Sequence, residues 1–202
     1  KFFNETIGFD YPWEKYAQII LQDHFGGMEN TSATTLSDTW AVSDARGRID
    51  NPSTSLLAHE LVHQWWGDLV TCRDFRHMWL NESFASYYDP LFHRMFLGQD
   101  EFDYTLYQNQ QAGVVVDTTR GRKPIVSVES YGENVYPRGA AVLHMLRFLL
   151  GDDLYHRAIK HYITKHAFQP VETNDLKIAI EEATGQNLQW FFDQWVYKAG
   201  HP

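Results

Sequence analysis

The sequence predicts an α+β fold that is mainly α-helical, with a small β-rich N-terminal part. Two stretches, at 14–24 and 33–43, contain the β-branched and aromatic residues typical of strands. From Pro52 onward, apolar residues recur mostly at helical spacings. At 202 residues, one domain is the default. We therefore expect a single domain over 1–202, composed of a β-rich part at 1–50 and a helical lobe at 51–202.

The first predicted strand, within 14–24, includes Tyr16, Ile19 and Ile20 and leads to a turn at Gly26-Gly27. The second, within 33–43, includes three threonines, Trp40 and Val42. A pair of glycines at a turn allows the backbone to come close to a bound ligand.

The next predicted helix carries two histidines, in His59-Glu60-Leu61-Val62-His63. Asn51 is a suitable N-cap, Pro52 suits the first helical position, and Gly67 suits the stop, so the motif is expected in mid-helix. Because 3.6 residues complete a turn, His59 and His63 lie on one face and can reach one metal ion. Glu60 projects at a different angle and can hold a water molecule beside that ion.

A further helix is expected from about Asn81, with Glu82 in its first turn. Eighteen residues separate Glu82 from His63. Two histidines and one glutamate leave a fourth zinc position open, as in hydrolytic zinc sites. Asp89 follows Glu82 by seven residues on the same face. It is either a hydrogen-bond acceptor for a zinc-binding histidine or a solvated helix carboxylate.

The remainder of the chain is predicted to alternate connections and helices. Residues 112–135 mix valines, glycine and proline and are expected to form a loop-rich connection. Amphipathic patterns predict helices over Asp152–Lys165 and Thr173–Thr184, the second followed by Gly185.

Composition excludes some classes of partner. The chain has 17 basic and 26 acidic residues, a net charge of −9, which disfavours nucleic acid and anionic membranes. The longest apolar stretch, Ala140–Leu150, contains His144 and Arg147, so no transmembrane segment is expected. Cys72 is the only cysteine and cannot form an intrachain disulfide, which favours a cytoplasmic or, alternatively, periplasmic location without fixing either.

Four segments together resemble one known family. His59–Thr71 and Trp79–Ala85 look like the core of the zinc aminopeptidases of the aminopeptidase N family, which are gluzincins. Gly26-Gly27-Met28-Glu29-Asn30 is similar to that family's G-x-M-E-N exopeptidase motif, and Tyr136-Pro137-Arg138-Gly139 to its Y-x-K/R-G motif. The similarity runs essentially from end to end and implies a thermolysin-like zinc-peptidase catalytic domain.

The chain departs from the family pattern in two small residues and in length. Gly27 stands where the family often has alanine, and Ser83 where it often has glycine. Family members are much longer, with an N-terminal β-domain and a helical C-terminal region. The resemblance therefore implies a domain excised from a longer multidomain protein, with its flanking domains absent.

The resemblance also assigns the remaining roles. It implies one Zn²⁺ per chain, held by His59, His63 and Glu82, with Glu60 as the general base and Tyr136 as the catalytic tyrosine that reaches the developing oxyanion. Glu29 is expected to bind the free α-amine of a peptide by a charge-assisted hydrogen bond. The segment that presents it consists of Gly26, Gly27, Met28 and Asn30.

These features predict a zinc metallo-aminopeptidase that uses zinc-activated water to hydrolyse the N-terminal peptide bond of peptides with a free N-terminus. One alternative is the epoxide hydrolysis performed by a branch of the same family with the same zinc core. Another is a non-catalytic binding module, or a zinc-binding fragment that is inactive in isolation.

Overall fold

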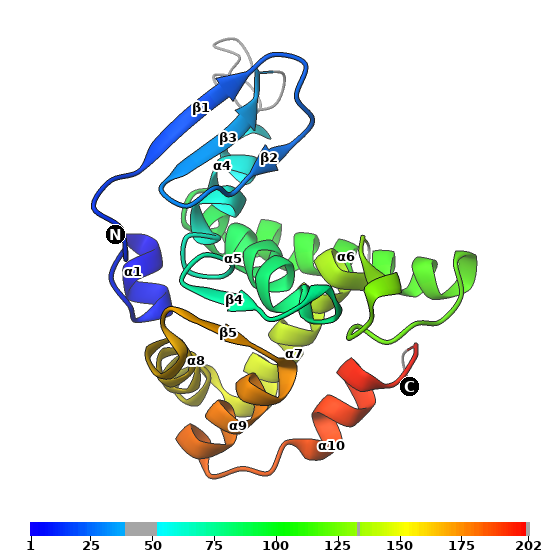
Figure 1. Ribbon diagram of the computed structural model, residues 1–202. Coiled ribbons are helices and arrows are strands. Elements are labelled where there is room, and N and C mark those ends of the chain that lie inside the picture. The colour runs from blue at the N-terminus through cyan, green and yellow to red at the C-terminus, as the bar shows by residue number, and fades with distance from the viewer. Residues whose placement is uncertain (39–51, 133, 201–202) are drawn as a thin grey trace.

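The computed structural model describes residues 1–38, 52–132 and 134–200. Figure 1 shows a small β-sheet at one end of the molecule and mainly helices, with a second short sheet among them, through the rest, which confirms the predicted α+β, mainly α-helical class. None of the helices in these ranges is both long and apolar enough to cross a bilayer.

The β-rich part contains a short helix, α1 (Phe2–Ile7), and a three-stranded sheet in the order β1 (Ala17–Leu21), β3 (Ala33–Ser37), β2 (Gly27–Met28). Strand β1 runs parallel to β3, and β2 runs antiparallel to it. The glycine-rich turn therefore opens into β2, which is an edge strand of this sheet within the described residues, and edge strands can pair with another chain.

Both predicted strands are confirmed, with shorter bounds. The strand expected within 14–24 is β1, and the one expected within 33–43 ends at Ser37 as β3. The part of the second prediction at 39–43, and the proposed N-cap Asn51, lie outside the described residues.

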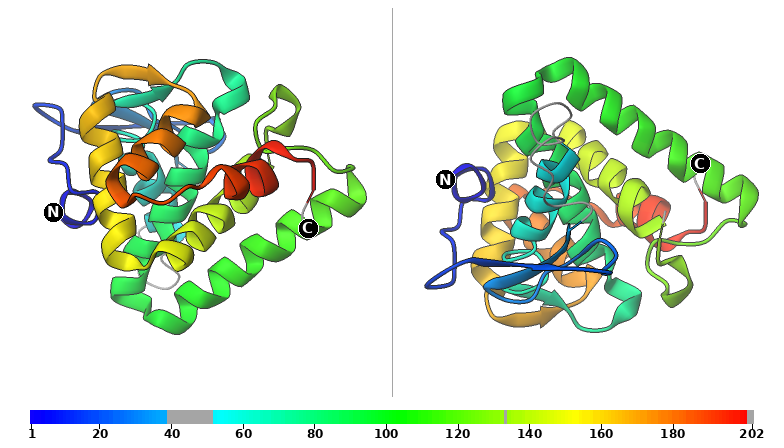
Figure 2. Two further views of the ribbon diagram at one scale, coloured as in Figure 1. Left: turned by 90° about the horizontal axis from the view of Figure 1, so that it is seen from below. Right: turned by 90° about the horizontal axis from the view of Figure 1, so that it is seen from above.

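The helical lobe is built around α5. It contains these helices: α4 (Pro52–Val62), α5 (Trp79–Leu97), α6 (Gln99–Thr119), α7 (Gly139–Leu150), α8 (Asp152–His166), α9 (Thr173–Thr184) and α10 (Gln189–Phe192). Shorter turns connect them: the 3₁₀ turns η1 (Phe75–His77) and η2 (Val128–Ser130), and the π-helical turns η3 (Asn134–Arg138) and η4 (Asp193–Tyr197). Strands β4 (Val70–Cys72) and β5 (Gln169–Val171) pair in parallel. Figure 2 shows the long α6 along one edge of this lobe.

An aromatic stack joins the turn after α4 to the centre of the lobe. Trp66 stacks on Phe84 of α5 at 4.4 Å between ring centroids and on Tyr162 of α8 at 6.0 Å. All three side chains are fully buried. Burial of such large apolar groups is the main favourable term in folding, so this stack fixes α5 relative to α4.

The prediction that Gly67 ends the metal helix is wrong, because α4 ends earlier, at Val62. The amides of Gln64 and Trp65 bond to carbonyls three residues back, at 3.1 and 3.0 Å, so the chain tightens out of α-geometry. Gly67, with φ of 136°, instead serves the turn into β4. The two-histidine motif therefore lies at the end of its helix and not in the middle.

The predicted loop-rich connection at 112–135 is confirmed for 120–132, which contains the short turn η2, and is wrong at both ends. Helix α6 continues to Thr119, and η3 is helical from Asn134. Gly113 suggests a loop but lies within α6, at a close contact with η3. A Cβ on Gly113 would lie 3.2 Å from the Cβ of Arg138. Both predicted C-terminal helices are confirmed, as α8 and α9.

Candidate active site

The end of α4 brings the two predicted histidine ligands together. His63 is the residue after the last of the helix, yet its amide still bonds to the His59 carbonyl at 3.4 Å. The i and i+4 rings therefore remain on one side of the chain. Their Nε2 atoms lie 3.2 Å apart.

Glu82 meets these histidines from the first turn of α5, as predicted. Its Oε2 atom lies 3.4 Å from His59 Nε2 and 3.2 Å from His63 Nε2. Tetrahedral zinc with bonds near 2.0–2.1 Å separates two ligand atoms by roughly 3.3 Å. The three atoms therefore have the spacing of three corners of a zinc tetrahedron, with the fourth corner open.

The protonation of these groups suits a cation. His63 Nδ1 lies 2.7 Å from the Trp66 carbonyl, which can only accept, so Nδ1 carries a proton and Nε2 is the ring nitrogen that faces His59 and Glu82. Oε2 of Glu82 is buried and has no hydrogen-bond partner. Burial opposes ionisation of Glu82, but the two histidines hold its pKa well below the usual range. This donor set therefore fits a bound Zn²⁺.

Glu60 lies beside this triad. It is 5% exposed, and its Oε2 is buried without a hydrogen-bond partner. Burial, together with Glu29 and Glu82, raises the pKa of Glu60 to about 7, against the opposing effect of His63. Gly27 gives this carboxylate its space, since a Cβ there would lie 2.3 Å from Glu60 Oε1. Glu60 is therefore a carboxyl group in a cleft with a pKa close to neutral pH, which is typical of a general base.

Most of the predicted exopeptidase segment faces the same cleft. Gly26, Gly27, Met28 and Glu29 line it, from the residue before strand β2 to the residue after it. Glu29 offers a carboxylate oxygen within 4.8 Å of ligand atoms of Glu60 and His63. Asn30 is turned toward β3, where its Nδ2 donates to Thr35 Oγ1 at 3.0 Å.

Tyr136 reaches the metal triad from the π-helical turn η3. Its ring is nearly parallel to that of His59, at 6.2 Å between centroids. Burial, Glu82 and Tyr131 all raise the pKa of Tyr136, so its phenol keeps its proton and can donate.

Sequence reasoning missed Tyr131, whose hydroxyl lies 2.8 Å from that of Tyr136. The two tyrosines are five residues apart, and the α-helical and strand periods do not pair such residues. Tyr131 directly follows η2 and Tyr136 lies in η3, so no single regular element pairs the two residues.

The cleft encloses about 700 Å³ and has an apolar side that spacing arguments did not identify. Phe25 and Met28 line it from the β-rich part, and Phe75, Met78 and Tyr131 from the helical lobe. Phe25, Phe75 and Tyr131 are 86%, 70% and 62% exposed, so apolar surface remains available to a ligand.

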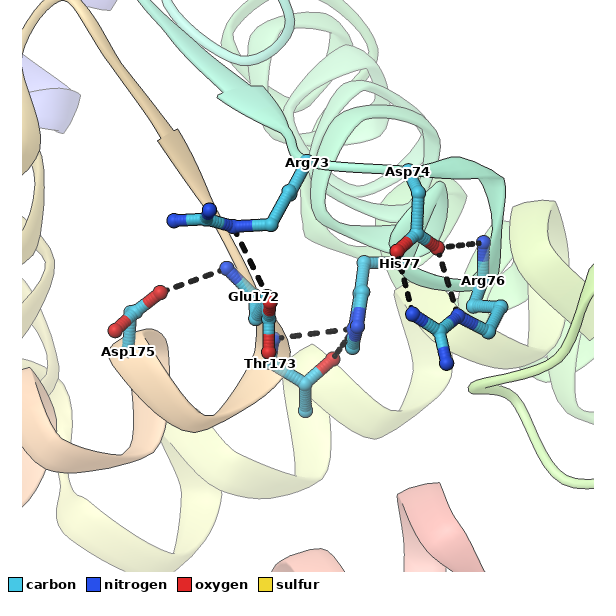
Figure 3. A network of polar contacts seen from close by, with 7 residues as sticks. All are labelled: Arg73, Asp74, Arg76, His77, Glu172, Thr173 and Asp175. Atoms are coloured by element: carbon cyan, nitrogen blue, oxygen red, sulfur yellow. Dashed lines mark hydrogen bonds and ion pairs between the residues drawn. The ribbon is translucent and has the colours of Figure 1, made fainter.

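A polar network, shown in Figure 3, anchors the η1 turn that carries Phe75. Asp74 accepts from the Arg76 amide at 2.9 Å, and His77 Nδ1 accepts from the Thr173 amide at 3.2 Å. Arg73 pairs with Glu172 at 3.2 Å. The start of α9 therefore fixes this wall of the cleft.

Asp89 lines the cleft, and its side chain is only 17% exposed. It is therefore not a solvated helix carboxylate, which is one of the two predicted roles for this residue. It accepts from Ser55 Oγ at 2.5 Å and pairs with His93 Nδ1 at 2.8 Å. Asp89 is also not the hydrogen-bond acceptor of His63, because the Nδ1 atom of that histidine faces the Trp66 carbonyl.

Comparisons with known proteins agree with this geometry. The family model described as the peptidase family M1 domain matches residues 1–195. Aminopeptidase N of Streptomyces lividans is 30% identical, over 98% of this chain and 25% of its own length. Aminopeptidase N of Lactobacillus helveticus is 31% identical, over 100% of this chain and 26% of its own length.

Solved structures give the same result. A mutant M1 zinc metallopeptidase from Deinococcus radiodurans, bound to a Tyr-Ser-Ala substrate, aligns with a TM-score of 0.79 at 25% identity. The alignment covers 98% of this chain and 43% of that one. This chain thus spans about a quarter of the length of the two aminopeptidases. Together with the donor set, the family identifies Zn²⁺ as the cofactor. From residue 1 to residue 195, the chain belongs to peptidase family M1.

Proposed function

We propose that this chain is the catalytic domain of a zinc aminopeptidase that hydrolyses the N-terminal peptide bond of peptides. The observation that carries the proposal is one cleft that holds a two-histidine, one-glutamate triad beside two further carboxylates, Glu60 and Glu29. The relatives are named as aminopeptidases and metallopeptidases, which supports the same chemistry.

His59, His63 and Glu82 hold the zinc in this proposal. When bound, the ion polarises the scissile carbonyl and makes water a nucleophile near neutral pH. Glu60 takes the proton from the attacking water and later delivers it to the leaving amine. A pKa near 7 suits both transfers, because the group can accept and release a proton at the same pH.

Tyr136 supplies the second donor that the tetrahedral oxyanion requires. Its phenol keeps its proton and lies near the metal triad, which supports this role. Donors fixed in place before the reaction stabilise developing charge without the cost of reorganising solvent.

Glu29 decides that the enzyme is an exopeptidase. Its carboxylate binds the protonated α-amine, and peptides that continue upstream lose this bond and meet the Gly26–Asn30 segment. Met28 contributes to the side-chain pocket, since it lines the cleft and is 44% exposed. The substrates are therefore peptides with a free N-terminus. The greater length of the relatives supports flanking domains that complete the cleft.

The test is hydrolysis of aminoacyl amides by the zinc-loaded chain, with each substrate supplied in free-amine and N-acetylated forms. Cleavage of only the free-amine forms is expected. Cleavage of both forms at similar rates would remove Glu29 from its role and make the enzyme an endopeptidase. Cleavage of neither, by a chain that binds zinc, would favour the alternative of a zinc-binding fragment that is inactive in isolation, and the longer parent protein is then assayed in the same way.

A further inference from the structure

Gln64 connects the metal site to the predicted amine-binding segment. It follows His63 directly, in the tight turn after α4, and its side chain is fully buried. Its carboxamide Nε2 donates to the Glu29 carbonyl at 3.1 Å, and its Oε1 accepts from the Ser32 amide at 2.7 Å. A carbonyl can only accept and an amide N–H can only donate, so these partners fix the orientation of the carboxamide.

Little regular structure holds Glu29 otherwise. The ladder between β2 and β3 ends at Met28, which pairs with Thr35. The chain then turns through Ser32, which has a left-handed φ of 62°. Such a conformation is unfavourable for a serine and needs support from its surroundings. The bond from the Ser32 amide to Gln64 contributes to that support at the end of the turn, together with the bond from the Ala17 amide to the Ser32 carbonyl at 2.8 Å.

We infer that Gln64 is a positioning residue that sets where the Glu29 carboxylate lies relative to the zinc ligands, and so determines selectivity for a free α-amine. Gln64 holds the backbone of Glu29 and directly follows His63 in the chain. It therefore links the proposed amine anchor to the proposed zinc ligands through one side chain. Displacements near 1 Å in such sites can cost about 100-fold in rate. This inference rests on the proposed role of Glu29 as the amine anchor.

The experiment measures amine binding directly, without turnover. L-leucinol has the free amine of a substrate but no scissile bond, and N-acetyl-L-leucinol lacks the charge. Calorimetry gives the dissociation constants of both for the zinc-loaded wild type and for Gln64→Leu, Glu29→Gln and the double variant. Zinc content and thermal unfolding are recorded for each protein.

We expect Glu29→Gln and Gln64→Leu each to weaken L-leucinol binding about tenfold, with zinc content unchanged. The double variant should be within about twofold of Glu29→Gln alone, because a residue that acts through Glu29 has no further effect once that carboxylate is gone. Binding of N-acetyl-L-leucinol should not change.

Trp13→Phe is the matched control. It removes one hydrogen bond to the same residue, from Trp13 Nε1 to the Gln64 backbone carbonyl at 3.2 Å, and leaves the carboxamide contacts in place. It should bind L-leucinol as the wild type does. Should Gln64→Leu fail to fold, Gln64→Met keeps the length of the side chain and is measured in the same way.

The outcomes distinguish the positioning role of Gln64 from the amine-anchor role of Glu29. If Glu29→Gln weakens binding but neither Gln64 variant does, the positioning role is wrong and the amine anchor stands. Two results would overturn the inference and leave Gln64 with a general packing role. In the first, Gln64→Leu weakens L-leucinol binding as much in the Glu29→Gln background as it does in the wild type. In the second, Trp13→Phe alone weakens L-leucinol binding as much as Gln64→Leu does. If Glu29→Gln has no effect on L-leucinol, the proposed amine anchor itself fails.

Discussion

Ser83 donates a hydrogen bond from its hydroxyl to the backbone carbonyl of Val135, 52 residues further along the chain. Ser83 directly follows the proposed metal ligand Glu82, and Val135 directly precedes Tyr136. Both residues are buried. This bond therefore connects the first turn of helix α5, which carries Glu82, to the π-helical turn that carries the proposed catalytic tyrosine.

Replacing Ser83 by alanine should loosen that connection. The Val135 carbonyl would be buried without its partner, which costs about 1–3 kcal/mol of unfolding free energy. We expect turnover of a free-amine amide to fall while zinc content is retained. Urea unfolding and steady-state kinetics measure both effects. Ser86→Ala, on the same helix and partly exposed, is the control and should match the wild type.

The Ser83 hydroxyl also explains why residue 139 is glycine. A Cβ on Gly139 would lie 1.8 Å from Ser83 Oγ and 2.7 Å from its Cβ. We expect Gly139→Ala to cost about 1–3 kcal/mol through overpacking. Ser83→Gly removes both clashing atoms, so in that background the change Gly139→Ala should cost much less unfolding free energy than it does in the wild type. An equal cost of Gly139→Ala in the two backgrounds would show that the contact is not the cause.

Glu60→Gln should separate zinc binding from catalysis. The amide has the same shape but cannot accept the proton of the attacking water, so turnover should fall about 10²–10⁴-fold. Zinc content by atomic absorption should equal that of the wild type. Full activity in this variant would exclude Glu60 as the base.

Removal of zinc should destabilise the fold as well as stop the reaction. The ion binds the folded triad, and free zinc at about 1,000 times its dissociation constant adds about 4 kcal/mol. A chelator should therefore lower the melting temperature, and added zinc should restore it. His63→Ala lacks one ligand, and its melting temperature should respond much less to either treatment.

His77 should make stability depend on pH. It is 7% exposed, and burial lowers its pKa below the ordinary 6.5, against the opposing effect of Asp74 and Glu172. The unfolded chain therefore takes up this proton first as the pH falls through 6.5. The contribution of His77 is complete above that pH and decreases below it, until the folded form is protonated as well.

The comparison is urea unfolding at pH about 7.5 and about 5.5 for the wild type and His77→Asn. Asparagine keeps an acceptor for the Thr173 amide but does not titrate, so its stability should fall less toward low pH. His161→Asn, on the surface, should keep the wild-type dependence. Equal slopes in all three proteins would contradict the prediction.

Part of the site could be predicted from local spacing. The i, i+4 separation of His59 and His63 is fixed by the pitch of one helix, and it holds even though α4 ends at Val62. The helical pattern likewise placed Glu82 in the first turn of α5. The family motifs pointed to Glu29 and Tyr136, and the fold brings both to this cleft, while their roles remain predictions.

The local pattern failed where long-range contacts decide the conformation. Gly113 predicts a break, but the close approach of Arg138 makes glycine the residue that fits within α6. Tyr131 meets Tyr136 only through the connection between η2 and η3, and Gln64 has no signal in the sequence that links it to Glu29.

The sequence alone therefore determined the fold class and the ligand types, because helical periodicity and side-chain chemistry act over a few residues. The tertiary structure decided which carboxylates and tyrosines meet the triad and what holds them there. Those choices depend on buried and partly buried hydrogen bonds between residues 32 to 52 positions apart, and such contacts are strengthened when packing reduces the access of water to them.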